Sequence, residues 1–176
     1  SEGSFIELYR RRQHDVFRFA YALTRSTSLA QDVAQEVFLK VLENVAGYAE
    51  EKGTVRAWLL GCARHVIFDG LRRDSRLVPS AEPDTAVACR NEDEIFRDQG
   101  LRRLHAEITR LPFEYREALV LCELAELSYA ETAMVLACPI GTVRSRLHRA
   151  RALLAERLGA DASTVAPLLK TTEACS

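Results

Sequence analysis

The chain has 176 residues, enough for one ordinary domain or two small ones, and 48% of them are hydrophobic and 28% charged, as in a globular protein with a core. No apolar run approaches the roughly 18 residues that span a bilayer, and no signal-peptide segment opens the sequence, so we expect a cytoplasmic protein without membrane insertion. The net charge of −1 does not exclude a nucleic-acid partner, because the charges are unevenly distributed. Acidic residues dominate residues 79–99, whereas arginines dominate residues 139–157.

The N-terminal part of the chain is expected to form three helices. Apolar residues recur at helical spacing over residues 5–23, and a short break follows. A second helix is predicted over residues 32–45, with a stripe of valines flanked by Leu42. Thr54 can cap a third helix, which is expected to continue to about residue 76.

A linker and a second helical block are expected to follow. Residues 77–91 contain Pro79 and Pro83 and show no periodicity, which is typical of a linker. We therefore expect the two helical blocks to fold independently. Ser128 and Glu131 have the spacing of a capping box, and Gly159 can end the last helix. The helices of this block are predicted over residues 94–110, 114–125, 128–136 and 140–158.

The last two of these helices, with a turn at residues 137–139, have the arrangement of a helix-turn-helix, whose second helix enters the major groove of DNA. Its apolar residues repeat at helical spacing and must face the core: Val143, Leu147, Ala150 and Leu154. Its other faces carry polar side chains: Thr142, Arg144, Ser145, His148, Arg149 and Arg151. Arg can bond guanine bidentately and Ser or Thr can meet base edges or phosphates, so this surface predicts DNA contact. Arg146 and Arg157 are better placed for phosphates. A merely solvated basic face is the alternative interpretation.

Two stretches of this block carry a long and specific motif set, Leu127–Ala133 and Pro139–Arg151, and Leu111-Pro112 with Tyr115–Leu119 precedes them. Together they resemble region 4 of the extracytoplasmic-function (ECF, group 4) RNA polymerase sigma factors of the sigma-70 family. The resemblance implies that the promoter −35 element is bound by the second helix of the helix-turn-helix. The residues expected to bind it are Thr142, Arg144, Ser145, His148 and Arg149.

The predicted second helix of the first block is similar to sigma region 2.2. Asp32, Gln35 and Glu36 follow a D-x-x-Q-E pattern, and their i, i+3, i+4 spacing places them on one face, opposite the valines. The resemblance implies that this face docks on the β′ clamp of core RNA polymerase, with Leu39 as an added apolar contact. Taken alone, the same pattern is also typical of a solvated acidic face.

The predicted third helix is similar to sigma regions 2.3 and 2.4, through Val55–His65 and Asp69–Arg73. The resemblance implies that the loop before this helix captures an unstacked base of the −10 strand, and Tyr48 is the aromatic residue at the corresponding place. His65 stands where family members often have Asn, and Trp58 is interpreted as a core residue. The residues expected to bind or melt the −10 element are Tyr48, Arg56, His65, Arg72, Arg73 and Arg76.

The expected fold is all-α, with two small helical domains joined by a flexible acidic linker. The domains are residues 1–76 (sigma region 2), a linker at 77–93, residues 94–158 (sigma region 4 with its helix-turn-helix) and a tail at 159–176. The linker acids either mimic nucleic acid in a basic channel of the polymerase or only keep the linker solvated. The expected partners are core RNA polymerase (β′ clamp and β subunit), promoter DNA and an anti-sigma factor.

The expected function is that of an alternative sigma factor, which is not an enzyme. An autonomous helix-turn-helix regulator is the main alternative, but it leaves the acidic face and Tyr48 unexplained. A decoy that titrates an anti-sigma factor would not need the arginines of the last helix. No P-loop, GxSxG or HExxH motif is present, and the cysteines lack metal-ligand spacing, so no cofactor and no metal are expected: Cys62, Cys89, Cys122, Cys138 and Cys175.

Overall fold

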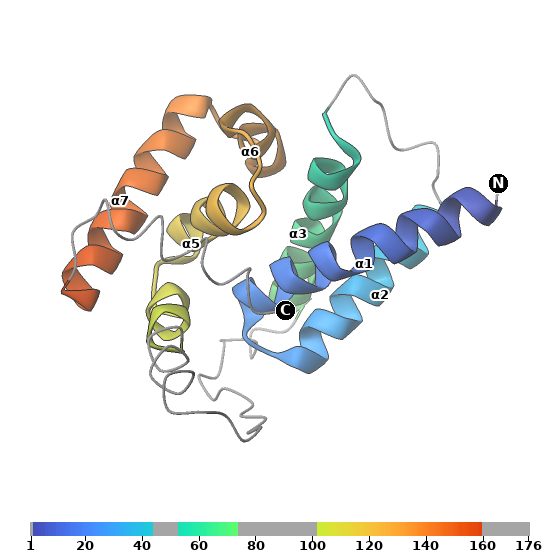
Figure 1. The fold of residues 1–176 in the computed structure, drawn as a ribbon, viewed down its shortest axis with the longest axis horizontal. Helices are drawn as coiled ribbons and strands as arrows, with labels where there is room; N and C mark the ends of the chain where they lie inside the picture. Colours follow the sequence, from blue (N-terminus) through green and yellow to red (C-terminus); the bar gives the residue numbers. More distant parts are fainter. Residues whose placement is uncertain (1, 44–52, 74–101, 160–176) are drawn as a thin grey trace, which may run out of the picture.

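The computed structural model describes residues 2–43, 53–73 and 102–159, with side chains for residues 5–43, 53–70 and 102–159. All regular elements in these ranges are helical, as the sequence predicts, and Figure 1 shows their arrangement. They are α1 (Glu2–Thr24), α2 (Thr27–Glu43), α3 (Val55–Arg73), a helix over residues 102–109, α5 (Phe113–Leu119), the π turn η3 (Val120–Leu124), α6 (Tyr129–Leu136) and α7 (Ile140–Leu158).

The first three helices pack together as one unit, drawn in blue to green in Figure 1. Its core is built from the predicted apolar stripes, including Leu23, Val37 and Leu59. Leu42, expected beside the valine stripe, is instead 51% exposed. The Thr54 hydroxyl accepts a hydrogen bond from the Ala57 amide at 3.2 Å and so caps α3 as predicted.

Helix α2 begins five residues before the predicted start at Asp32. The cause is a cap that the sequence analysis missed: the Ser26 hydroxyl accepts a hydrogen bond from the Leu29 amide at 3.2 Å. Arg25 before it takes a left-handed conformation, with φ of 56°, and turns the chain between the helices. The break is therefore shorter than expected.

The second unit contains the predicted helix-turn-helix. Ser128 and Glu131 form the capping box at the start of α6, Ala137 makes the turn with a left-handed φ of 51°, and Gly159 ends α7 with φ of 65°. The helix expected over 114–125 is interrupted by the π turn, which the periodicity did not indicate. Of the helix predicted over 94–110, the structure describes only residues 102–109 and the turn that follows.

The two units are in direct contact, which the sequence analysis did not predict. Helix α3 packs on α6, and α1 packs on the π turn, so buried side chains of both units belong to one continuous core. In Figure 1, α7 lies on the outer side of the second unit, away from α1, α2 and α3. The predicted linker at residues 77–93 and most of the tail at 159–176 lie outside the described residues.

Candidate nucleic-acid interface

The orientation of α7 follows from its buried stripe. Val143, Leu147, Ala150 and Leu154 are at most 1% exposed, as the sequence predicted, and they fix the rotation of the helix about its axis. The opposite face is therefore directed to solvent. It presents Arg144, Ser145, His148 and Arg149 as exposed residues, with Thr142 half-buried beside them.

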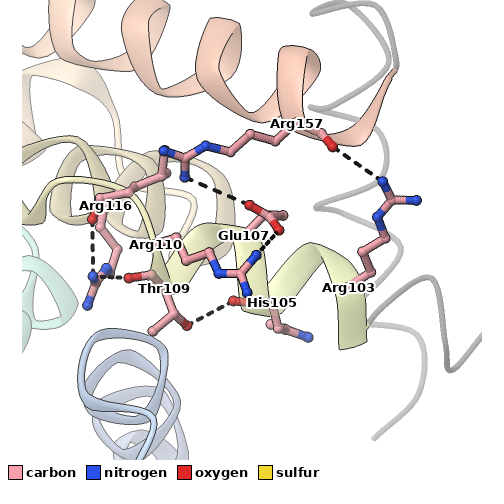
Figure 2. Close-up of polar contacts among 8 residues, drawn as sticks. Arg103, His105, Glu107, Thr109, Arg110, Arg116 and Arg157 are labelled. Carbon is pink, nitrogen blue, oxygen red and sulfur yellow. Dashed lines mark hydrogen bonds and ion pairs between the residues drawn. The ribbon is translucent and has the colours of Figure 1, made fainter. Parts of the chain in front are cut away.

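Three other arginines of α7 are paired with carboxylates of their own domain. Arg146 lies 3.5 Å from Glu114, and Arg157 lies 3.8 Å from Glu107. Figure 2 shows Glu107 between Arg157 and Arg110, with which it also forms an ion pair. The sequence analysis expected Arg146 and Arg157 to contact phosphates. In the structure, part of the positive charge of each is neutralised by its carboxylate partner.

Arg151 was expected on the polar strip beside the base-reading face, but it turns back into the domain. It forms an ion pair with Glu123 of the π turn, whose side chain is only 7% exposed. The hydrogen bond from Arg151 to Glu123 raises the pKa of the guanidinium, so Arg151 stays charged and bound. Its role in the structure is to hold α7 against the π turn.

The remaining two arginines of α7 contact tyrosines instead of acids. The Arg149 guanidinium donates to the Tyr115 hydroxyl at 3.5 Å, and Arg144 lies over the Tyr129 ring, 5.9 Å from its centroid. Neither forms an ion pair with a carboxylate in the described part of the chain. Their full positive charge is thus available to a ligand. Pairs so distant in sequence give no periodic signal, and the sequence analysis missed both tyrosines.

The predicted core-binding face lies on the surface of α2. Asp32, Gln35, Glu36 and Leu39 are all exposed, and Leu39 has 56% of its surface open to solvent. Glu36 pairs with Lys40 at 2.9 Å within the helix, an exposed pair that contributes little to stability. Asp32 and Gln35 also line a groove between α1 and α2.

The two predicted −10 residues whose side chains the structure describes, His65 and Arg56, lie on different faces of α3. His65 is highly exposed, with its ring 3.7 Å from Asp69 one turn on. Arg56 is nine residues earlier, which places it on the opposite side of the helix. It is only 27% exposed and pairs with Asp15 of α1 at 3.4 Å. Trp58 packs against the core, as expected.

The other predicted −10 residues are not fully described. Arg72 and Arg73 lie in the last turn of α3, but their side chains fall outside the described set. Tyr48 and Arg76 fall outside the described residues altogether.

The described residues contain no cluster of His, Cys, Asp and Glu that could hold a metal ion. None of the described helices combines the length and the apolar character that crossing a membrane requires.

Known proteins match most of the chain. The family model for sigma-70 region 2 matches residues 8–77, and that for sigma-70 region 4 matches residues 101–154. The ECF RNA polymerase sigma factor SigC of Mycobacterium tuberculosis is 38% identical over 159 residues, which cover 88% of this chain and 84% of that protein. SigE of Mycolicibacterium smegmatis is 35% identical over 168 residues, which cover 93% of this chain but only 65% of that protein.

Two solved structures share the fold. One is the sigma factor RpoE of Bartonella quintana in complex with the anti-sigma factor NepR, with a TM-score of 0.74 and 23% identity over 90% of this chain and 98% of that one. The other is CnrH in complex with the cytosolic domain of CnrY, with a TM-score of 0.66 and 23% identity over 92% of this chain and 91% of that one.

Proposed function

The chain belongs to the extracytoplasmic-function sigma factors of the sigma-70 family, and we propose that it binds core RNA polymerase in the cytoplasm and directs initiation at promoters with particular −35 and −10 elements. Its contribution is recognition and positioning, so no catalytic step is assigned to its side chains. The single observation that carries the proposal is the exposed face of α7, the second helix of a helix-turn-helix, where Arg144 and Arg149 pair with no carboxylate among the described residues.

In this proposal α7 enters the major groove at −35. Arg144 and Arg149 are suited to guanine edges, and Ser145 and His148 lie on the same exposed surface. Thr142 is half-buried at the start of the helix, where it suits a phosphate. The carboxylates behind Arg146, Arg151 and Arg157 orient the helix and confine its free positive charge to the reading face.

At −10 the proposal assigns strand capture to Tyr48 and the outer face of α3. Stacking of one base on a tyrosine contributes about 1–3 kcal/mol, enough to favour an unpaired base once the duplex has opened. His65, Arg72 and Arg73 of α3 are proposed to contact the strand, together with Arg76, which lies outside the described residues. Arg56 is paired and faces the other way, so we assign it a structural role in place of the DNA contact that was expected.

The proposed protein partners are the β′ clamp and β subunit of core polymerase and an anti-sigma factor. The clamp is assigned to the exposed Asp32, Gln35, Glu36 and Leu39 of α2, because acids beside one apolar side chain suit a basic helical partner. An anti-sigma partner is supported by the RpoE structure, in which the similar protein is bound to NepR.

The test is transcription in vitro with purified core polymerase on fragmented genomic DNA. Adding the protein should produce transcripts with defined start points and shared upstream elements, which core polymerase alone does not give. A chain that binds DNA without core polymerase and yields no such transcripts would instead fit the autonomous regulator.

A further inference from the structure

A cavity of about 160 Å³ lies where α1 and α3 come close to the π turn. One side of it is formed by α1, through residues that share a helix face because they are spaced by three and four positions. The polar side chains around the cavity come from three helices and from the residue directly after α1: Asp15, Arg18, Arg25, Arg56 and His105. All five are half-buried, so the cavity is recessed and polar on this side.

The charge around this cavity is mainly positive. Among the described residues that line it, three arginines share the cavity with one carboxylate, that of Asp15. Asp15 is divided between two partners, because it pairs with Arg12 at 3.1 Å and with Arg56 at 3.4 Å. The arginines of the lining are therefore only partly neutralised in the part of the chain that the structure describes. Such a field favours an anion in the cavity.

Two of these arginines have contacts that leave them able to bind a ligand. The Nε of Arg56 is buried and makes no hydrogen bond to the described residues, and the bond from its Nη2 to Asp15 is long, at 3.4 Å. A buried donor without a partner calls for an explanation, and a bound ion is one. The Arg25 guanidinium lies over the Tyr21 ring, 4.9 Å from its centroid, a contact that restricts the side chain without neutralising its charge.

The size and the remaining wall of the cavity indicate the class of anion. Val120 and Leu124 of the π turn add apolar side chains to the lining, and π turns are frequent at functional sites. Pockets for drug-sized ligands measure about 300–1,000 Å³, so a cavity of about 160 Å³ suits a small oxyanion better than a nucleotide. Arginine binds phosphate oxygens through parallel hydrogen bonds from its planar guanidinium, and several arginines together favour a multiply charged oxyanion.

We propose that this cavity is a binding site for a small phosphate-like oxyanion, held by Arg18, Arg25 and Arg56, with the His105 imidazole as a further hydrogen-bond donor. Free phosphate and the phosphate group of a nucleotide share the chemistry that the arginines recognise, and the volume of the cavity favours free phosphate. The site goes beyond the proposed function and does not depend on it, because none of these four residues is assigned there to DNA or polymerase.

The test measures binding of inorganic phosphate to the full chain by isothermal titration calorimetry, in chloride buffer at constant ionic strength. Two variants each remove one charge from the lining, Arg18→Gln and Arg25→Gln. A third, Ala22→Leu, keeps every charge but fills the cavity from the α1 side. The matched control is Arg11→Gln, because Arg11 lies on the same helix and pairs with Glu7 on its exposed surface. Circular dichroism checks that each variant keeps its helices.

The wild type and Arg11→Gln should bind one phosphate per molecule with the same affinity. Arg18→Gln and Arg25→Gln should each bind phosphate about tenfold more weakly, because each loses a charge-assisted hydrogen bond to the anion. Ala22→Leu should show no binding, since the larger side chain occupies the space of the anion. ADP should bind no more tightly than phosphate, because its base and ribose do not fit in the cavity.

The proposal would be overturned if the wild type showed no saturable phosphate binding, or if both arginine variants bound phosphate like Arg11→Gln. Unchanged binding by Ala22→Leu would also overturn it, because the anion would then lie outside the cavity. Tighter binding of ADP, or displacement of phosphate by a short single-stranded DNA, would indicate a nucleotide or nucleic-acid site instead. If one arginine variant lost its helices, the other and Ala22→Leu would decide, with the same expected outcomes.

Discussion

The five arginines of α7 fall into two groups with different contacts. Arg146, Arg151 and Arg157 each meet a carboxylate of the same domain, whereas Arg144 and Arg149 lie near tyrosine side chains. A tyrosine can restrict an arginine side chain without neutralising it, which suits a group that must later bind a base edge. Charge composition alone does not distinguish these two kinds of arginine.

The first prediction separates a base-reading residue from a paired one. Arg149→Ala should remove about 1–3 kcal/mol of discrimination within the −35 element, because a bidentate arginine contact depends on the base. Arg157→Ala should leave sequence preference unchanged and lower the salt slope by at most about one, since Arg157 already pairs with Glu107. The measurement is a titration of the full chain on wild-type and −35-mutated duplexes at several salt concentrations. If Arg149→Ala weakened binding to every duplex by the same factor, the assignment of Arg149 to base reading would be wrong.

A second residue-scale prediction concerns pH. Burial raises the pKa of Glu117, against the opposing effect of Arg64. A carboxyl whose folded pKa lies above its unfolded value of about 4.3 binds protons more readily when folded, so its contribution to stability falls as pH rises from there through the raised pKa. Glu117→Gln removes this titration. The unfolding free energy of the wild type minus that of Glu117→Gln should therefore decrease between about pH 4 and the raised pKa and then become constant. A difference that increases over this range would contradict the assigned direction.

At the scale of elements, local signals in the sequence predicted most helix boundaries. The capping box at Ser128, the Thr54 cap and the Gly159 end each lie within one turn of the element they define, so they can be read from spacing alone. The predicted start of α2 was wrong because Ser26 caps the helix directly after the left-handed Arg25. The π turn was not predicted because it has no periodic pattern in the sequence. Arg64–Glu117 and Arg151–Glu123 depend on tertiary packing, which no local pattern contains.

The element-scale prediction concerns α2. Replacing Asp32, Gln35 and Glu36 together by Ala should abolish co-purification with core polymerase while leaving helicity intact. The reason is that these exposed side chains do not support the core of the domain. Glu156→Ala, an exposed acid on α7, is the control and should bind core polymerase like the wild type. An unchanged pull-down for the triple variant would remove the main support for polymerase docking through this face.

At the scale of the whole molecule, the connection between the two domains limits how far apart they can bind on DNA. Residues 74–101 join α3 to the helix over residues 102–109 and span at most about 3.5 Å per residue, or roughly 100 Å. That length can bridge the roughly 85 Å that about 25 base pairs of duplex span between −35 and −10 at 3.4 Å per pair. The length and the negative charge of the connection are separate properties. The sequence analysis left open whether the acidic residues bind a basic channel of the polymerase or only keep the connection solvated.

The last prediction distinguishes the effect of the length of this connection from the effect of its charge. Deleting residues 79–90 shortens the maximum reach by about 40 Å at 3.5 Å per residue. Transcription should then be lost first from promoters with the longest spacing between −35 and −10, and it should persist longest where the spacing is short. A second variant keeps the length but neutralises the acids, with Glu82, Asp84, Glu92, Asp93, Glu94 and Asp98 changed to the matching amides.

If the acids bind a basic channel of the polymerase, the amide variant should reduce transcription at every spacing alike, because it weakens binding without changing reach. If they only keep the segment solvated, the amide variant should transcribe like the wild type. The measurement is transcription in vitro on one promoter with a graded series of spacers. If the deletion lowered transcription equally at every spacer length, the reach of the connection would not be limiting. A length limit must reduce transcription more strongly as the distance between the two elements grows.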